Sequence, residues 1–83
     1  MMTVLPNGII GGGLVITDAR DFGEALRRRR KELGYTQAFL SEFSGFSVTF
    51  ISDLENGKNT AELGKSICLA NLLGLDCLLV PRN

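Results

Sequence analysis

The sequence predicts an all-α fold, a bundle of four to five helices followed by a short C-terminal β-strand. Apolar residues recur at helical spacing in successive segments between residues 17 and 74. Each of these segments opens at a residue that can cap a helix and stops at or near a glycine. Residues 75–80 then read Leu-Asp-Cys-Leu-Leu-Val, a β-compatible run closed by Pro81.

Length and composition allow one domain and argue against several kinds of chemistry. A chain of 83 residues can build one modest core. Two cysteines are too few for a disulfide framework, and the apolar neighbours of Cys68 and Cys77 predict reduced, buried thiols. With no histidine and only two separated cysteines, we do not expect a zinc site, and we expect no other metal and no cofactor. With no plausible nucleophile–base pair, we do not expect an enzyme.

The chain divides into three parts. Residues 1–16 lack a helical period and are predicted to form a flexible N-terminal arm, unless they are a cloning or start-site extension. This arm has no basic start and is broken by three glycines, so we expect neither a signal peptide nor a membrane span. Residues 17–74 form the helical domain, and residues 75–83 form the strand.

The first helix is predicted to begin after Thr17 or Asp18 and to stop at Gly34. One inward stripe follows the i, i+4, i+8, i+11 spacing of Phe22, Leu26, Arg30 and Leu33. An arginine in that stripe needs a buried partner or an exit to water. The basic run 27–31 turns by about 100° per residue, so it surrounds the helix and does not form a single stripe. The whole chain has a net charge of zero, which does not favour a nucleic-acid partner.

Two short helices with a glycine between them are predicted next. Thr36 should cap the second helix, which ends near Phe43 and turns Leu40 and Phe43 inward. Gly45 permits the turn, and Ser47 should cap a third helix that ends near Glu55. This is the layout of a helix-turn-helix, whose second helix enters the major groove of DNA.

The last helix and the strand complete the prediction. Asn59 or Thr60 should cap the fourth helix, whose apolar face comprises Leu63, Ile67, Ala70 and Leu73. A lone strand would leave its amides unpaired within its own chain. We therefore expect a homodimer formed by strand residues Leu75, Cys77, Leu78, Leu79 and Val80.

Residues 22–80 resemble the helix-turn-helix family of phage repressors, Cro proteins and bacterial XRE-type regulators, which have the lambda-repressor-like fold. The resemblance is carried by Leu-Gly-Tyr-Thr-Gln at 33–37, Leu40 with the small Ser41, Gly45, Ser47, and Ile-Ser-Asp-Leu-Glu-Asn-Gly-Lys at 51–58. The segments Thr-Ala-Glu-Leu-Gly-Lys at 60–65 and Leu-Gly-Leu-Asp-Cys-Leu-Leu-Val-Pro at 73–81 are similar to HipB-like antitoxins, whose last strand pairs with that of the dimer mate.

The resemblance implies a role for each matching position. The base-facing residues are expected to be Ser47, Val48, Thr49 and Ser52. The DNA phosphates would contact Gln37, Asn56, Lys58 and Asn59, and an internal ion pair would join Arg30 to Glu55. This chain departs from the family where related recognition helices carry Gln, Arg or Lys, because its own residues there are short. Phe39 and Phe50 add bulk whose effect on binding is open.

The implied function is that of a dimeric repressor bound to double-stranded operator DNA on the bacterial nucleoid, in the cytoplasm. It would also be the antitoxin of a HipA-like serine/threonine kinase toxin. One alternative is a stand-alone repressor of a phage or mobile element without a toxin partner. Another, suggested by zero net charge and short recognition residues, is an interaction module that has lost DNA binding.

Overall fold

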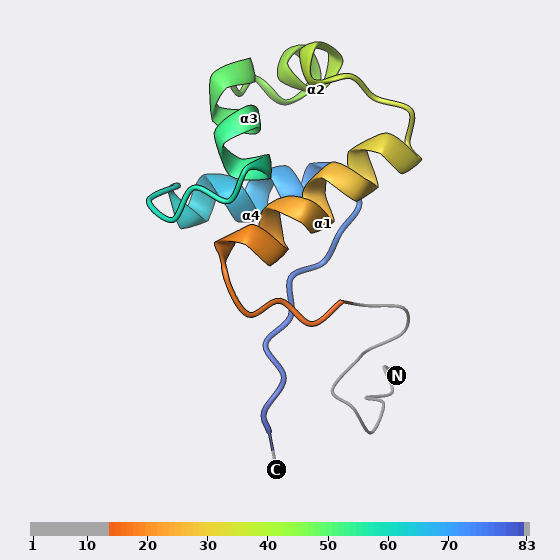
Figure 1. The fold of residues 1–83 in the computed structure, drawn as a ribbon. Coiled ribbons are helices and arrows are strands. Elements are labelled where there is room, and N and C mark those ends of the chain that lie inside the picture. The colour runs from red at the N-terminus through yellow and green to blue at the C-terminus, as the bar shows by residue number, and fades with distance from the viewer. Residues whose placement is uncertain (1–13, 83) are drawn as a thin grey trace.

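The computed structural model describes residues 14–82, and within them the chain forms four α-helices and no strand. These helices are α1 (Ala19–Glu32), α2 (Gln37–Ser44), α3 (Val48–Glu55) and α4 (Leu63–Leu72). Figure 1 shows α2 and the start of α3 at the end of the molecule opposite the C-terminal segment. The predicted all-α bundle is confirmed.

Side-chain caps fix the start of the first three helices. Asp18 caps α1 by accepting a 2.8 Å hydrogen bond from the Asp21 backbone amide. Thr36 and Ser47 cap α2 and α3 in the same way, each accepting a 3.0 Å bond from the amide three residues on. Such caps satisfy amides that have no partner within the helix. All three caps lie where the sequence predicted them.

The turn between α2 and α3 is short and fixed. Gly45 has a φ of 82°, a left-handed conformation that a residue with a Cβ rarely adopts. Across the turn, the Ser41 hydroxyl donates a 2.6 Å hydrogen bond to the Phe46 carbonyl oxygen. The turn therefore holds the two helices at one mutual angle.

A small core joins all four helices. Its buried members are Leu26, Leu40, Ile51, Leu54, Leu69, Ala70 and Leu73. Burial of each large apolar side chain contributes about 1.5–3 kcal/mol. Gly23 allows α1 to cross α3 closely, because a Cβ at this position would lie 2.3 Å from the Leu54 carbonyl oxygen. Helix α3 is thus held directly against α1.

Several predicted burials are wrong. Phe43 is 54% exposed and Leu63 is 70% exposed. Helix α2 has only eight residues, so it turns Leu40 alone fully into the core, and Phe43 stacks on the ring of Phe39 with centroids 6.1 Å apart. Leu63 is the first residue of α4, where it extends beyond the core. The two cysteines, expected to be buried, are also exposed.

The start of α4 also differs from the prediction. Its N-cap is Glu62, in place of Asn59 or Thr60, and this residue makes no side-chain capping bond. Residues 58–61 form a turn, in which the Ala61 amide donates to the Lys58 carbonyl oxygen at 3.3 Å. The turn uses the residues that were expected to begin the helix.

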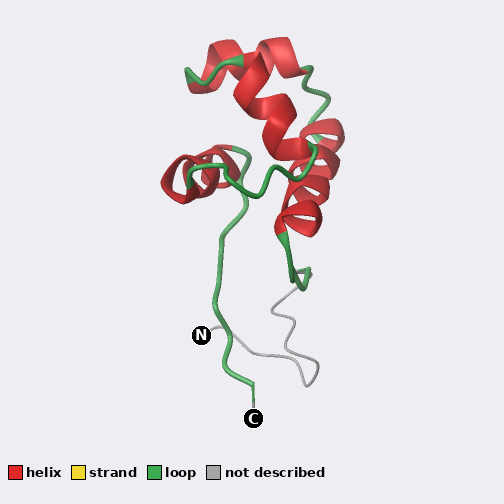
Figure 2. Ribbon diagram, turned by 60° about the vertical axis from the view of Figure 1, so that its left-hand side comes forward, coloured by secondary structure: helices red, strands yellow, loops and turns green. Residues whose placement is uncertain are grey.

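The C-terminal strand predicted at 75–83 is not formed in the described part of the chain. Residues 75–82 are irregular and run away from the helices, as Figure 2 shows. A strand needs a neighbour to pair with its backbone groups, and a single chain provides none for this segment. Of the proposed strand residues, Leu75 packs against the core. Cys77, Leu78 and Leu79 are exposed, and Val80 is half-buried.

The N-terminal arm lies mostly outside the described residues, since only its last three residues, Leu14–Ile16, belong to them. All three are exposed. Within the described residues, no helix has both the length and the apolar character that crossing a membrane requires.

Candidate nucleic-acid interface

The predicted base-facing residues lie on one exposed side of α3. Ser47, Val48 and Thr49 follow one another at the N-terminus of this helix, and all three are exposed. Ser52 is half-buried and lies four residues after Val48 and three after Thr49, so it shares their side of the helix. The structure therefore brings these four side chains together at the start of the helix.

A buried carboxylate lies at the other end of α3. Glu55 is 3% exposed and accepts hydrogen bonds from Arg30 Nε at 2.6 Å and from Arg30 Nη2 at 3.0 Å. The ion pair expected between these residues is thus formed. Arg30 also donates to the Tyr35 carbonyl oxygen at 2.8 Å. One arginine therefore joins α1 to α3 and to the loop before α2.

The surroundings of Glu55 keep it ionised. Burial by itself raises the pKa of this carboxyl group, but the hydrogen bonds from Arg30, Gln37 and Arg27 outweigh burial and lower the pKa below its ordinary value. The same hydrogen bond to Glu55 raises the pKa of Arg30. The pair is therefore charged throughout the neutral pH range.

The side chain of Gln37 uses one of its N–H groups inside the protein. Its Nε2 atom donates a 3.1 Å hydrogen bond to Glu55 Oε1, and the residue is half-buried. An amide nitrogen carries two hydrogens, so one N–H and the carbonyl oxygen of this side chain are left for other partners. Gln37 is thus anchored at the start of α2 by the ion pair.

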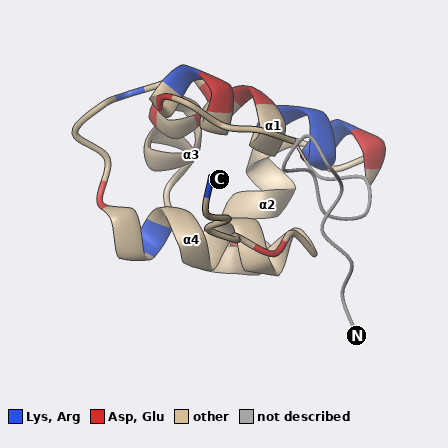
Figure 3. Cartoon of the chain, turned by 90° about the horizontal axis from the view of Figure 1, so that it is seen from below, with Lys and Arg blue, Asp and Glu red and all other residues tan. Residues whose placement is uncertain are grey.

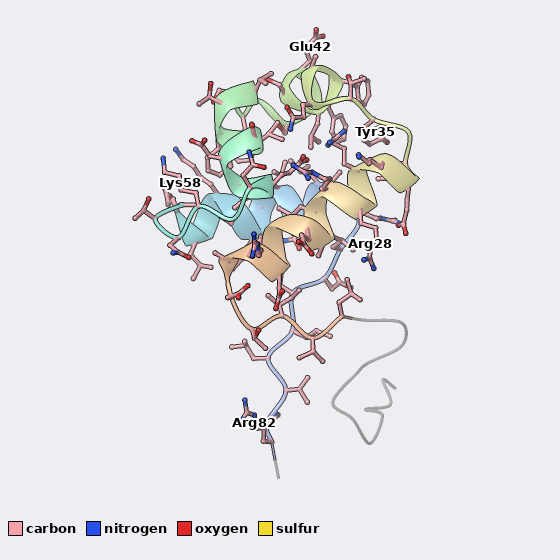
Figure 4. All side chains as sticks on the ribbon, viewed as in Figure 1. Arg28, Tyr35, Glu42, Lys58 and Arg82 are labelled. Atoms are coloured by element: carbon pink, nitrogen blue, oxygen red, sulfur yellow. The ribbon has the colours of Figure 1, made fainter. Side chains whose placement is uncertain are left out.

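The other predicted phosphate contacts follow α3. Asn56, Lys58 and Asn59 are all exposed in the loop after this helix, and Figure 4 shows Lys58 beside that loop. Lys58 Nζ lies 3.4 Å from Asp53 Oδ2, and both groups are largely exposed. Exposed pairs of this kind contribute little to stability, so the lysine can exchange its partner for a phosphate. Asn56 adjoins the base-facing set, because its Nδ2 atom lies 3.5 Å from the Ser52 hydroxyl.

Two contacts of the basic run were not predicted. Arg27 Nη2 donates to Asn56 Oδ1 at 3.0 Å, and Arg29 Nε donates to the Leu73 carbonyl oxygen at the end of α4 at 2.8 Å. The sequence indicated that the run surrounds the helix, but no spacing rule connects residues that lie 29 or 44 positions apart. Only the three-dimensional structure identifies these partners.

Positive charge is unevenly distributed over the molecule. Figure 3 shows Lys and Arg residues along α1, together with acidic ones, whereas α2 and α3 contain no lysine or arginine. The N-termini of these two helices carry partial positive charge from their free amides. Among the eight residues predicted to contact DNA, positive charge therefore comes from Lys58 and from those amides.

Comparisons with known proteins agree with this geometry. The family model described as Helix-turn-helix matches residues 26–79. An uncharacterised HTH-type transcriptional regulator of Sinorhizobium fredii, y4mF, is 41% identical over 54 residues, which cover 65% of this chain and 71% of that protein.

Two solved structures share the fold. HipB in the HipB-O4 20mer complex matches with a TM-score of 0.77 and 22% identity, over 86% of this chain and 100% of that chain. The structure of the HipA-HipB-O2-O3 complex matches with a TM-score of 0.76, also at 22% identity, over 86% of this chain and 100% of that chain. Both similarities concern the fold.

Proposed function

Because this chain belongs to the helix-turn-helix (XRE) family of DNA-binding transcriptional regulators, we propose that it is a sequence-specific repressor that binds operator DNA as a homodimer. The exposed N-terminal side of α3 carries this proposal. Its side chains are short and uncharged, so the helix can approach base edges closely. Val48 and the methyl group of Thr49 suit a thymine methyl, and the hydroxyls of Ser47 and Ser52 can donate to or accept from either kind of base edge.

The phosphate contacts would lie on either side of this reading surface. The second N–H of Gln37 and the free amides at the start of α2 would bind one phosphate. Asn56, Lys58 and Asn59 would bind phosphates beyond the far end of α3. This arrangement fixes the register of α3 in the groove without itself reading sequence.

Exposed apolar side chains support the homodimer. Leu78 is half-exposed and Leu79 is fully exposed in the single chain. Residues 75–80 would span roughly 20 Å as a strand, enough for an antiparallel ladder with the same segment of a second copy. Such pairing would satisfy the backbone groups and cover the leucines. It would also present two recognition helices to half-sites about 34 Å apart.

The proposed second role is that of an antitoxin. The shared fold with HipB, including HipB in a complex with HipA, supports a HipA-like kinase toxin as partner of this chain in the bacterial cytoplasm. A stand-alone repressor would use the same DNA-binding surface and the same dimer. Co-expression with the neighbouring gene followed by native mass spectrometry separates the two, since only the antitoxin forms a stable complex with a kinase-like product.

Selection from a random-sequence duplex library tests DNA binding itself. The selected duplex is then titrated by fluorescence anisotropy at ~50 and ~200 mM salt. With about two to four cation–phosphate contacts per dimer, affinity should fall by about tenfold to 150-fold over this range. Failure to enrich any sequence would contradict the proposed function and would favour an interaction module.

A further inference from the structure

We propose that Arg27 is a positioning residue for DNA binding: it fixes the side-chain amide of Asn56 so that its NH₂ group faces the phosphate backbone. This inference rests on the proposed function. Helix α1, which lies behind α3, would thereby take part in shaping the surface that contacts DNA.

The guanidinium of Arg27 connects two consecutive residues at the end of α3. Its Nη2 atom donates to Asn56 Oδ1 at 3.0 Å, and its Nε atom lies 3.5 Å from Glu55 Oε1. The side chain of Arg27 is 42% exposed, whereas that of Glu55 is 1% exposed. One end of the guanidinium therefore contacts the buried ion pair while the other end reaches the surface.

The buried end of this contact is held by several hydrogen bonds. Glu55 is held by two hydrogen bonds from Arg30 and one from Gln37. Residues from α1, α2 and α3 thus determine where the carboxylate lies, and Arg27 is placed relative to it. The orientation of the Asn56 amide is in this way tied to the packing of all three helices.

The chemistry of an asparagine amide makes its orientation matter. Its oxygen only accepts hydrogen bonds and its nitrogen only donates, while a phosphate oxygen only accepts. An exposed amide without a fixed partner can present either end. Because Arg27 occupies Oδ1, the Nδ2 group remains as the donor, and it lies 3.5 Å from the Ser52 hydroxyl. The donor is therefore directed toward the same surface as a predicted base-facing residue.

A direct role of Arg27 as a phosphate-binding cation predicts a different result. Each cation that neutralises a phosphate contributes about −0.9 to the slope of log affinity against log salt. An uncharged amide contributes almost nothing to that slope. Loss of an orienting arginine should therefore weaken binding at every salt concentration while leaving the slope unchanged.

The experiment is a double-mutant cycle on the full-length protein, using the duplex selected by the wild type from a random-sequence library. Affinities are measured by fluorescence anisotropy between ~50 and ~200 mM salt for R27M, N56A and the double variant. We expect the R27M dimer to bind about tenfold to a hundredfold more weakly, as for the loss of one hydrogen bond in each protomer. The double variant should bind no more weakly than N56A alone, with the wild-type salt slope.

Arg28 supplies the matched control. It is exposed on the same helix and lies on the opposite side of the molecule from Lys58 (Figure 4). R28M removes one positive charge from α1, as R27M does. It should bind the selected duplex with the wild-type affinity and salt slope. All titrations are made well below the melting temperature of each variant, measured by circular dichroism, so that every variant is folded.

Three results would overturn the inference. These are R27M binding as tightly as the wild type, effects of R27M and N56A that multiply in the double variant, and a salt slope reduced by about 1.8 in R27M, which is about 0.9 for each of the two arginines lost from the dimer. If the wild type selects no duplex at all, the proposed function fails, and this inference fails with it.

Discussion

Replacing Arg30 with methionine should lower the free energy of unfolding by about 3 kcal/mol at pH 7. Methionine keeps much of the apolar stem that packs in the inward stripe of α1 but removes the charge and all guanidinium donors. Glu55, which is 3% exposed, then loses both of its short hydrogen bonds. The Tyr35 carbonyl oxygen also loses the hydrogen bond that it accepts from Arg30.

The magnitude follows from the partners that remain. Breaking a buried ion pair costs about 3–5 kcal/mol, because the remaining charge is left without compensation. Here Gln37 still donates to the carboxylate at 3.1 Å, and Arg27 lies 3.5 Å from it, so we take the lower end of the range. A domain of this size has a total stability of roughly 4–12 kcal/mol. The variant should therefore melt about 12–24 °C below the wild type.

The stability difference between the variant and the wild type should change with pH in one direction. In the wild type the pKa of Glu55 is lowered on folding, so its contribution is present above the unfolded-state pKa and is lost as pH falls through the folded-state value. In the variant, burial acts without the main partner and should raise that pKa. Lowering the pH from 7 toward 5 should then stabilise the variant relative to the wild type.

Urea unfolding followed by circular dichroism at pH 7 and pH 5 provides the measurement. Protein concentration is kept constant because dimerisation changes apparent stability. R28M, at an exposed position of the same helix, is the control. A variant with the wild-type unfolding midpoint, or with a deficit that grows as pH falls, would refute the reasoning.

Three further predictions concern the packing of α1 on α3, the recognition of bases and the formation of the dimer. Gly23→Ala should destabilise the fold by about 1–3 kcal/mol, since its Cβ would lie 2.3 Å from the Leu54 carbonyl oxygen. Gly64→Ala, whose nearest neighbour is 3.9 Å away, should be neutral or stabilise by up to about 1 kcal/mol; equal thermal shifts of the two would contradict the close crossing. Thr49→Ala should weaken operator binding by about 1 kcal/mol and relax base preference, and unchanged discrimination among operator variants would argue against base reading. Deletion of residues 75–83 should give monomers or aggregates that bind operator poorly, and sedimentation of an unchanged dimer would exclude this segment as the interface.

Local signals in the sequence were sufficient to place the starts of the first three helices, though not that of α4. Asp18, Thr36 and Ser47 cap their helices because a cap depends on amides only two or three residues away. Burial was harder to predict. Phe43 and Leu63 have the right spacing to face inward, but short helices bury few residues, and how far each extends over the core depends on tertiary packing.

The site was predictable to a similar extent. Resemblance to a known family indicated the Arg30–Glu55 pair, and the basic run indicated only that some arginines must contact protein. The bonds of Gln37 to Glu55 and of Arg27 to Asn56 join distant positions, so no periodicity reveals them. The predicted strand is absent from the described residues of the single chain because its backbone groups have no pairing partner there.

The absence of lysine and arginine from α2 and α3 has a consequence for how this protein would search a chromosome. Retention on arbitrary duplex depends almost wholly on cations held against phosphates. With few such contacts, each molecule would spend little time on irrelevant sequence and would exchange rapidly with solution. Occupancy of the correct site would then depend on how well α3 fits the bases, and few copies per cell would be sequestered elsewhere.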